Sequence, residues 1–149
     1  MSGMIRAVAA ALALTTAVAQ ADIEMYEDYE LGEGVASITT VKVDANMFEV
    51  YLEGLMQTWV AANNVAKELG HIASYGIYAS ELPQSGDFNM MLVVRYASDA
   101  DLAPSKERYE AFMKAWGEAN RDNNQKISAE YPKVRKITGE YRMREIVIK

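Results

Sequence analysis

The chain has no cysteine and a single histidine, His71, among its 149 residues. Without cysteine, disulfide bonds, thiol catalysis and cysteine-ligated metal sites are excluded. One histidine also excludes a zinc or non-haem iron site built from several histidines of one subunit, so we expect no metal. The sequence lacks a glycine-rich phosphate loop, a serine elbow motif and a spaced acidic calcium loop. Its function must therefore be inferred from less specific features.

Positive charge is scarce, since 15 Lys and Arg residues stand against 21 Asp and Glu residues and give a net charge of −6. An acidic surface repels nucleic-acid phosphates and anionic lipid headgroups. We therefore expect neither nucleic-acid binding nor peripheral membrane binding. Half of the residues are apolar and 24% are charged, which is typical of a globular domain with one core.

Residues 1–21 have the pattern of a secretory signal peptide. Arg6 supplies the positive charge, Ala7 to Val18 form an uncharged apolar run, and Ala19-Gln20-Ala21 fits the cleavage motif. We expect cleavage between Ala21 and Asp22 and a periplasmic or secreted protein. The alanine-rich signal and the lack of an Asn-x-Ser/Thr sequon favour a bacterial periplasm. The alternative is an uncleaved anchor, although the apolar run is shorter than the roughly 20 residues that span a bilayer.

The remaining chain divides into an acidic segment and one domain. Residues 22–36 are rich in Asp and Glu and are expected to form an exposed N-terminal arm. Residues 37–149 are expected to fold as a single domain. Its predicted elements are a strand at 37–43, a helix at 48–69, strands at 72–79 and 89–96, a helix starting after Ser105, and a last strand at 139–148. Asp44 or Asn46 can cap the first helix, and Glu49 is placed to complete a capping box with Asn46.

This order of elements predicts an α+β, ferredoxin-like βαββαβ fold. In that fold both helices cover one face of a four-stranded antiparallel sheet. The strand around Met90 to Val94 is apolar on both faces, so both faces need cover, and the helices supply only one. We therefore expect a homodimer in which two sheets pack face to face as a barrel.

This pattern resembles the dimeric α+β barrel superfamily. Its members include antibiotic-biosynthesis-type monooxygenases, stress-responsive barrel proteins, NIPSNAP-like proteins and haem-degrading enzymes. The resemblance covers about Ser37 to Lys149 and rests on element order and strand patterning. It implies that a small ligand would lie between the sheet and the helices, and that a histidine is the axial ligand in haem-binding members.

Six residues are candidates for ligand binding on this basis: Trp59, His71, Tyr75, Asn89, Arg95 and Trp116. The tryptophans fall on the apolar faces of the two helices, and the alternative is that these aromatic side chains simply fill the core. Arg95 could also join Arg142 and Arg144 in a cluster that receives a carboxylate, unless these side chains pair with surface acids. His71 could instead be an ordinary histidine at a helix end.

Three functions are compatible with these residues. The first is an exported, non-enzymatic protein that binds a small apolar or aromatic ligand and needs no cofactor. The second is a cofactor-free oxygenase resembling the monooxygenase members, which would need a pocket holding Trp59 or Trp116 beside Asn89 or His71. The third is a haem-binding protein with His71 as the ligand.

Overall fold

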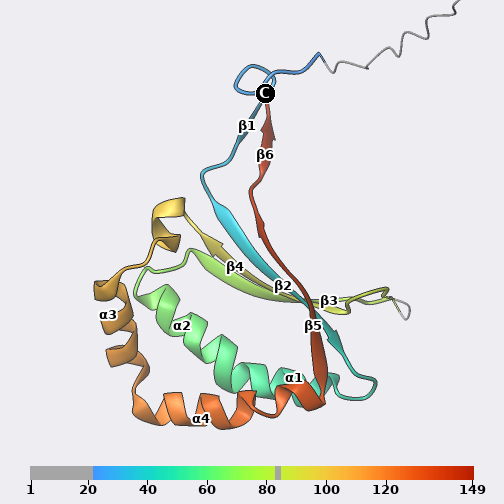
Figure 1. Ribbon diagram of the computed structural model, residues 1–149, viewed down its shortest axis with the longest axis vertical. Coiled ribbons are helices and arrows are strands. Elements are labelled where there is room, and N and C mark those ends of the chain that lie inside the picture. The colour runs from blue at the N-terminus through green and yellow to red at the C-terminus, as the bar shows by residue number, and fades with distance from the viewer. Residues whose placement is uncertain (1–21, 83–84) are drawn as a thin grey trace, which may run out of the picture.

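The computed structural model describes residues 22–82 and 85–149, so the predicted signal peptide lies outside the described residues. Four antiparallel strands form the main sheet in the order β3-β4-β2-β5. Their bounds are β2 (Val35–Val43), β3 (Ser74–Ala79), β4 (Met90–Tyr96) and β5 (Arg135–Met143). The helices all lie on one side of this sheet (Figure 1). The predicted ferredoxin-like fold is therefore confirmed by the strand order and the placement of the helices.

The first crossover is one long helix with a wider turn in its middle. It runs through α1 (Phe48–Leu55), the π-helical turn η1 (Met56–Val60) and α2 (Ala61–Glu68). Its buried residues are Tyr51, Gly54, Leu55 and Thr58, a face that includes a glycine and a threonine. The predicted capping box is wrong, because Asn46 has φ 63° and no side chain caps the helix.

The second crossover breaks into two helices, α3 (Lys106–Trp116) and α4 (Glu118–Ser128). The predicted cap of α3 is confirmed, since the backbone N–H of Arg108 donates to the Ser105 hydroxyl at 3.2 Å. The break falls at Gly117, whose φ of 77° is unfavourable for any residue with a Cβ. The polar stretch from Glu118 therefore forms a separate helix, which runs back beneath the sheet (Figure 1). The short 3₁₀ turn η3 (Tyr131–Lys133) then leads into β5.

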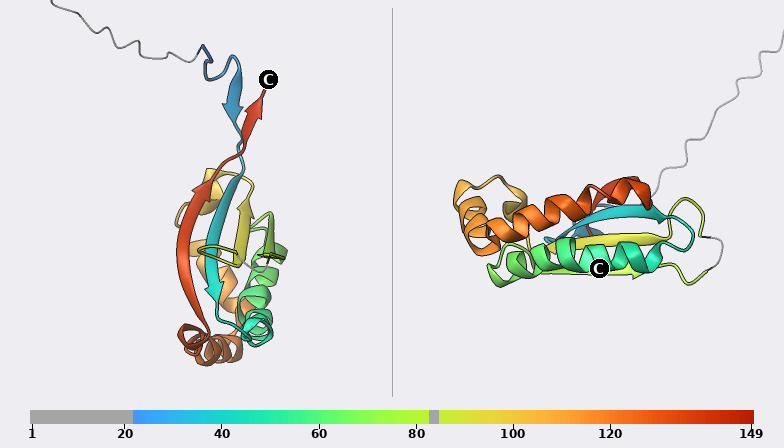
Figure 2. Two further views of the ribbon diagram at one scale, coloured as in Figure 1. Left: turned by 90° about the vertical axis from the view of Figure 1, so that its right-hand side faces the viewer. Right: turned by 90° about the horizontal axis from the view of Figure 1, so that it is seen from below.

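The core lies between the sheet and these helices. Its buried side chains belong to Val41, Val43, Tyr51, Leu55, Met90, Leu92 and Tyr131. Alternate residues of β2 and β4 supply the sheet side, as expected from the twofold side-chain repeat of a strand. The opposite face carries Tyr78, Tyr141 and Met143, which are 46%, 53% and 53% exposed. This second face, which has no helix over it, is called the open face below (Figure 2).

The last strand of the main sheet starts and ends earlier than the sequence predicted, and it is less regular. β5 begins at Arg135 instead of Gly139 and ends at Met143. Its register against β2 shifts between Thr40 and Val41, which pair with Gly139 and Ile137 and leave Thr138 as the extra residue of a bulge. Because of this bulge, Ile137 and Glu140 both reach the helix side of the sheet, although they are an odd number of residues apart.

The acidic arm contains a strand that the sequence analysis missed. β1 (Tyr29–Leu31) pairs with β6 (Ile146–Ile148) as a separate antiparallel two-stranded sheet. This ribbon projects away from the four-stranded sheet, and the C-terminus lies near its tip (Figures 1 and 2). None of the helices in the described part of the chain is long and apolar enough to cross a membrane.

Candidate functional site

A cavity of about 380 Å³ lies between the sheet and the helices. Its size is at the lower end of the range for small-molecule sites. Strands β2, β4 and β5 form one wall, and the helix from α1 to α2 forms the other. The lining residues are Thr39, Val41, Tyr51, Leu55, Thr58, Trp59, Ala62, Leu92, Asn124, Tyr131, Arg135, Ile137 and Glu140. The set is mostly apolar and aromatic with a few polar groups, which is the composition expected of a ligand pocket.

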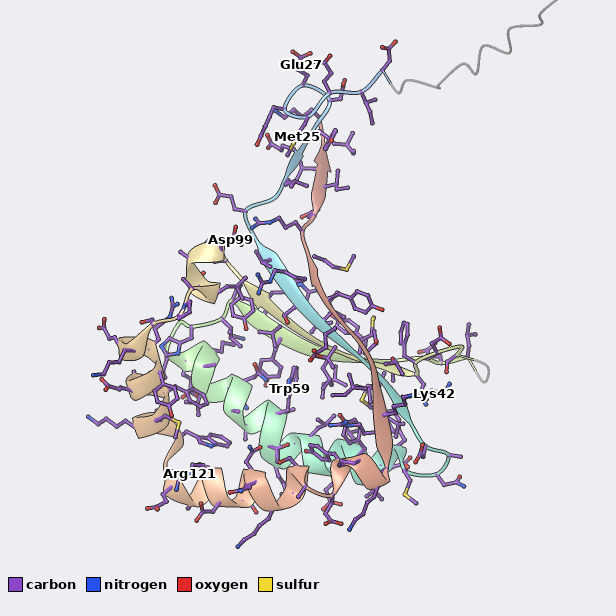
Figure 3. The ribbon with its side chains drawn as sticks, in the orientation of Figure 1. Met25, Glu27, Lys42, Trp59, Asp99 and Arg121 are labelled. Carbon is purple, nitrogen blue, oxygen red and sulfur yellow. The ribbon has the colours of Figure 1, made fainter. Side chains whose placement is uncertain are left out.

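The wider turn η1 positions two of these side chains. It carries Thr58, which is fully buried, and Trp59, which lies between the helix and the sheet (Figure 3). The Trp59 and Tyr75 rings meet in a T-shaped arrangement, with centroids 5.4 Å apart and an interplanar angle of 86°. π-helical turns inside α-helices occur frequently at functional sites. Here the turn lies beside the cavity.

Gly54 allows the helix to approach the segment after α4. A Cβ at this position would lie 2.9 Å from Cε1 of Tyr131 and 3.3 Å from Cγ2 of Ile127. The absence of a side chain therefore admits the Tyr131 ring, which packs edge-on against Tyr51 with centroids 5.0 Å apart. These two rings form one end of the cavity.

The Tyr131 hydroxyl is bonded to Thr58. Thr58 Oγ1 donates to the Gly54 carbonyl at 2.9 Å, and this uses its only hydrogen. The hydroxyl of Tyr131 must therefore be the donor in its short hydrogen bond with Thr58. Burial raises the pKa of Tyr131, and the hydrogen bond with Thr58 and the charge of Arg135 oppose that rise. The phenol stays neutral near pH 7.

Arg135 is the cation of this cavity. Its Cζ lies 5.9 Å from the centroid of the Tyr51 ring and 5.5 Å from that of Tyr131, within the range of cation–π contacts. Its Nε is buried and has no hydrogen-bond partner. Among the residues that the structure describes, no carboxylate forms a salt bridge with it. Burial raises the pKa of Tyr51 as well, and the Arg135 charge acts against it.

The structure brings only some of the predicted site residues together. Trp59 lines the cavity, and Tyr75 on β3 packs against the Trp59 ring. The Tyr75 hydroxyl donates to Asn64 at 2.6 Å. Trp116 is buried on α3 and stacks with Phe112 at 6.0 Å, and it does not line this cavity.

The other three lie elsewhere. His71 follows the end of α2, where its backbone N–H donates to the Ala66 carbonyl. Asn89 joins two strands at the far end of the sheet, because its side chain accepts from the Val43 N–H at 2.7 Å and donates to the Val43 carbonyl at 2.9 Å. Arg95 projects on the open side, 3.5 Å from the Tyr78 hydroxyl. A ligand-binding role for these six residues stays a prediction.

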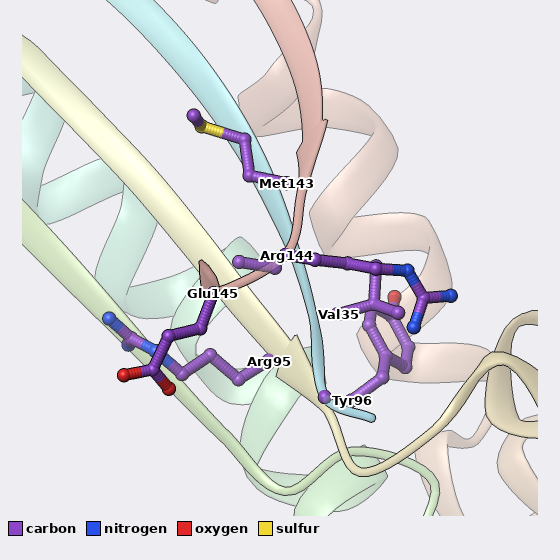
Figure 4. Close-up of a pocket in the computed structure, with 8 residues that line it drawn as sticks. Val35, Arg95, Tyr96, Met143, Arg144 and Glu145 are labelled. Carbon is purple, nitrogen blue, oxygen red and sulfur yellow. The ribbon is translucent and has the colours of Figure 1, made fainter. Parts of the chain in front are cut away.

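Arg95 lines a second, smaller cavity of about 280 Å³. It lies where the ribbon leaves the main sheet and is bordered by Val35, Tyr96, Met143, Arg144 and Glu145 (Figure 4). Arg144 already has partners there, because it forms an ion pair with Asp99 and donates to the Gly32 carbonyl at 3.2 Å. Arg142 lines a separate surface hollow with Ser37 and Tyr141.

The sequence analysis missed Tyr51, Tyr131 and Arg135. Tyr51, Leu55 and Thr58 follow a helical i, i+4, i+7 spacing, which could have revealed this buried face. Tyr131 and Arg135 lie on either side of Pro132, which disturbs the helical pattern, and no signal in the sequence places them beside α1.

Comparison with known proteins gives fold-level likeness. No protein-family model matches the chain, and no curated protein matches it. A structure of HapK from Hahella chejuensis is 9% identical, with 74% of this chain and 91% of that chain covered at a TM-score of 0.45. A NIPSNAP family protein of unknown function from Agrobacterium tumefaciens is 13% identical, with 78% and 90% covered at 0.44. A dimeric protein of unknown function and ferredoxin-like fold from Bacteroides fragilis is 14% identical, with 80% and 99% covered at 0.42. The fold assignment rests on this chain's own strand order and helix placement.

Proposed function

We propose that the protein binds a small aromatic or apolar molecule in the cavity between its sheet and its helices. The observation that carries this proposal is the cavity itself, about 380 Å³ in volume and bordered by Trp59, Tyr51 and Tyr131. Leu55 and Leu92 add apolar surface to the same space. An aromatic ligand would contact ring faces and edges there while removing its own apolar surface from water.

A thermal-shift screen of small aromatic compounds tests this function. Any compound that binds the folded state raises the apparent melting temperature by mass action. A hit should lose its effect in Ile137→Trp, because Ile137 lines the cavity and a larger ring there would fill it. Lys136→Trp is the matched control, since Lys136 is the exposed neighbour on the same strand. A hit that survives Ile137→Trp, or a broad screen without hits, would contradict the proposal.

The oxygenase and haem alternatives stay predictions. The cavity contains Trp59 but does not contain Asn89, His71 or Trp116, the other residues of the constellation expected for an oxygenase. Haem binding through His71 is checked by adding haemin to the protein and to His71→Ala, because only an axial ligand makes the Soret shift depend on that side chain.

We further propose that the protein is a homodimer through its open face. Tyr78, Tyr141 and Met143 are exposed there, and Val93 and Met91 lie on the same side of β4. The helices cover the other side, so a second copy of this sheet is the partner with matching shape and chemistry.

Export is proposed from residues 1–21, and protein recovered from its native host should then begin at Asp22.

A further inference from the structure

We propose that the ligand of the cavity between sheet and helices is an aromatic carboxylate whose carboxylate pairs with Arg135. This inference rests on the proposed function and names the chemical class of the ligand. It follows from the charge, the hydrogen-bonding capacity and the shape of the site.

The cavity has one strong cation with an unused buried donor. The planar guanidinium of Arg135 is a donor-only group, and its buried Nε has no acceptor. Buried donors in folded proteins are nearly always paired, so one left without an acceptor calls for an explanation. The contacts of Arg135 with the Tyr51 and Tyr131 rings supply no acceptor for this Nε. A carboxylate is the acceptor that matches this planar fork with two parallel hydrogen bonds.

Among the residues that the structure describes, no carboxylate pairs with the Arg135 guanidinium. Both tyrosines next to Arg135 have a raised pKa, because burial disfavours the phenolate, so they are neutral near pH 7. Glu140 lines the same cavity, but it is exposed and forms no salt bridge with Arg135. A ligand anion would provide the missing charge.

The rest of the cavity favours an aromatic body on that anion. Trp59 and Leu92 provide apolar surface away from the guanidinium, and Tyr51 and Tyr131 add ring surface beside it. A carboxylate attached to one or two fused rings would satisfy both parts at once. An inorganic anion would leave the apolar wall unused.

Isothermal titration with matched ligand pairs tests this inference. The probes are benzoate, 1-naphthoate and biphenyl-4-carboxylate, each compared with its own carboxamide. These pairs differ in charge and hardly in shape. We expect at least one carboxylate to bind more tightly than its amide by about tenfold or more, as for a hydrogen-bonded charge pair out of water.

Variants of Arg135 assign the preference to this residue. Arg135→Met should bring the two members of each pair to equal affinity, whereas Lys136→Met should leave the preference intact. Arg135→Lys keeps the charge but lacks the planar fork, so it should lose part of the preference even if the methionine variant does not fold.

The outcomes separate the two proposals. Equal binding of acids and amides to the unaltered protein, or binding of neutral aromatic compounds alone, would overturn the carboxylate inference and leave the proposed function standing. A preference that survives in Arg135→Met would also overturn it. Failure of every probe and of the broader thermal-shift screen would overturn both.

Discussion

The hydroxyl of Thr58 takes part in two hydrogen bonds inside the core, one to the Gly54 carbonyl and one from Tyr131. Thr58→Val would leave the buried hydroxyl of Tyr131 without an acceptor, at a cost of about 1–3 kcal/mol. Tyr131→Phe removes the donor instead, and Thr58 keeps its bond to the backbone. We therefore expect the phenylalanine variant to lose only about 1 kcal/mol in the free energy of unfolding.

Urea unfolding of both variants shows which of the two substitutions is more destabilising. Tyr109→Phe is the control, because Tyr109 is exposed on α3 and should change nothing. Tyr131→Phe being more destabilising than Thr58→Val would contradict the assignment of Tyr131 as the donor.

Because the Tyr51 phenol is buried, we expect the protein to lose stability at alkaline pH. Burial raises the pKa of Tyr51 above its ordinary value of about 10, with Arg135 opposing the rise. Above that pH the unfolded chain releases the proton while the native state keeps it, so the free energy of unfolding falls as pH rises. Below about pH 9 the ionisation of Tyr51 does not change the free energy of unfolding.

Tyr51→Phe isolates the contribution of this residue. Its unfolding free energy should fall less steeply than that of the unaltered protein between about pH 10 and 12, and the two curves should run parallel from pH 7 to 9. Parallel curves across the whole range would show that burial does not hold Tyr51 neutral.

At the scale of elements, the approach of α1 to the segment after α4 depends on Gly54. Alanine would normally favour a helix by about 1 kcal/mol over glycine. At this position its Cβ would lie 2.9 Å from the Tyr131 ring, so the ring and Ile127 would have to move. We expect Gly54→Ala to destabilise the protein by about 1–3 kcal/mol, as overpacking does.

Thermal or urea unfolding checks this prediction. Glu53→Ala is the neighbouring control, because Glu53 is exposed and its replacement should stay within about 0.5 kcal/mol. A Gly54→Ala variant as stable as the control, with unchanged ligand binding, would contradict the tight contact that forms this end of the cavity.

The sequence predicted the helices and strands that have a local signal and missed those that depend on long-range pairing. Regular periodicity and β-branched runs are local signals, so the helix from Phe48 and the strands β2, β3 and β4 were predicted with bounds shifted by at most two residues. The pairing of β1 with β6 joins the two ends of the chain, and the bulge at Thr138 appears only in the register with β2. Such long-range pairings have no local signal. For the same reason Trp59 was identified as a candidate, whereas Tyr131 and Arg135, which tertiary packing brings to it, were not.

At the scale of the whole molecule, the open face predicts self-association. Met91 lies opposite Thr40 and Tyr78 on the neighbouring strands and faces the side without helices. We expect the protein to sediment as a dimer at micromolar concentration and Met91→Lys to shift it towards monomer, because a buried unpaired ammonium opposes the contact. Gln57→Lys on an exposed helix position is the control. A compact monomer of the unaltered protein would contradict a dimer through this face.

The position of a bound ligand decides whether the cavity between the sheet and the helices is the binding site. A crystal structure with the tightest ligand from the thermal-shift screen should show it between Trp59 and Arg135, with its ring against the apolar wall of the cavity. Electron density for the ligand in the smaller cavity beside Arg95, or on the open face, would contradict a binding site between the sheet and the helices.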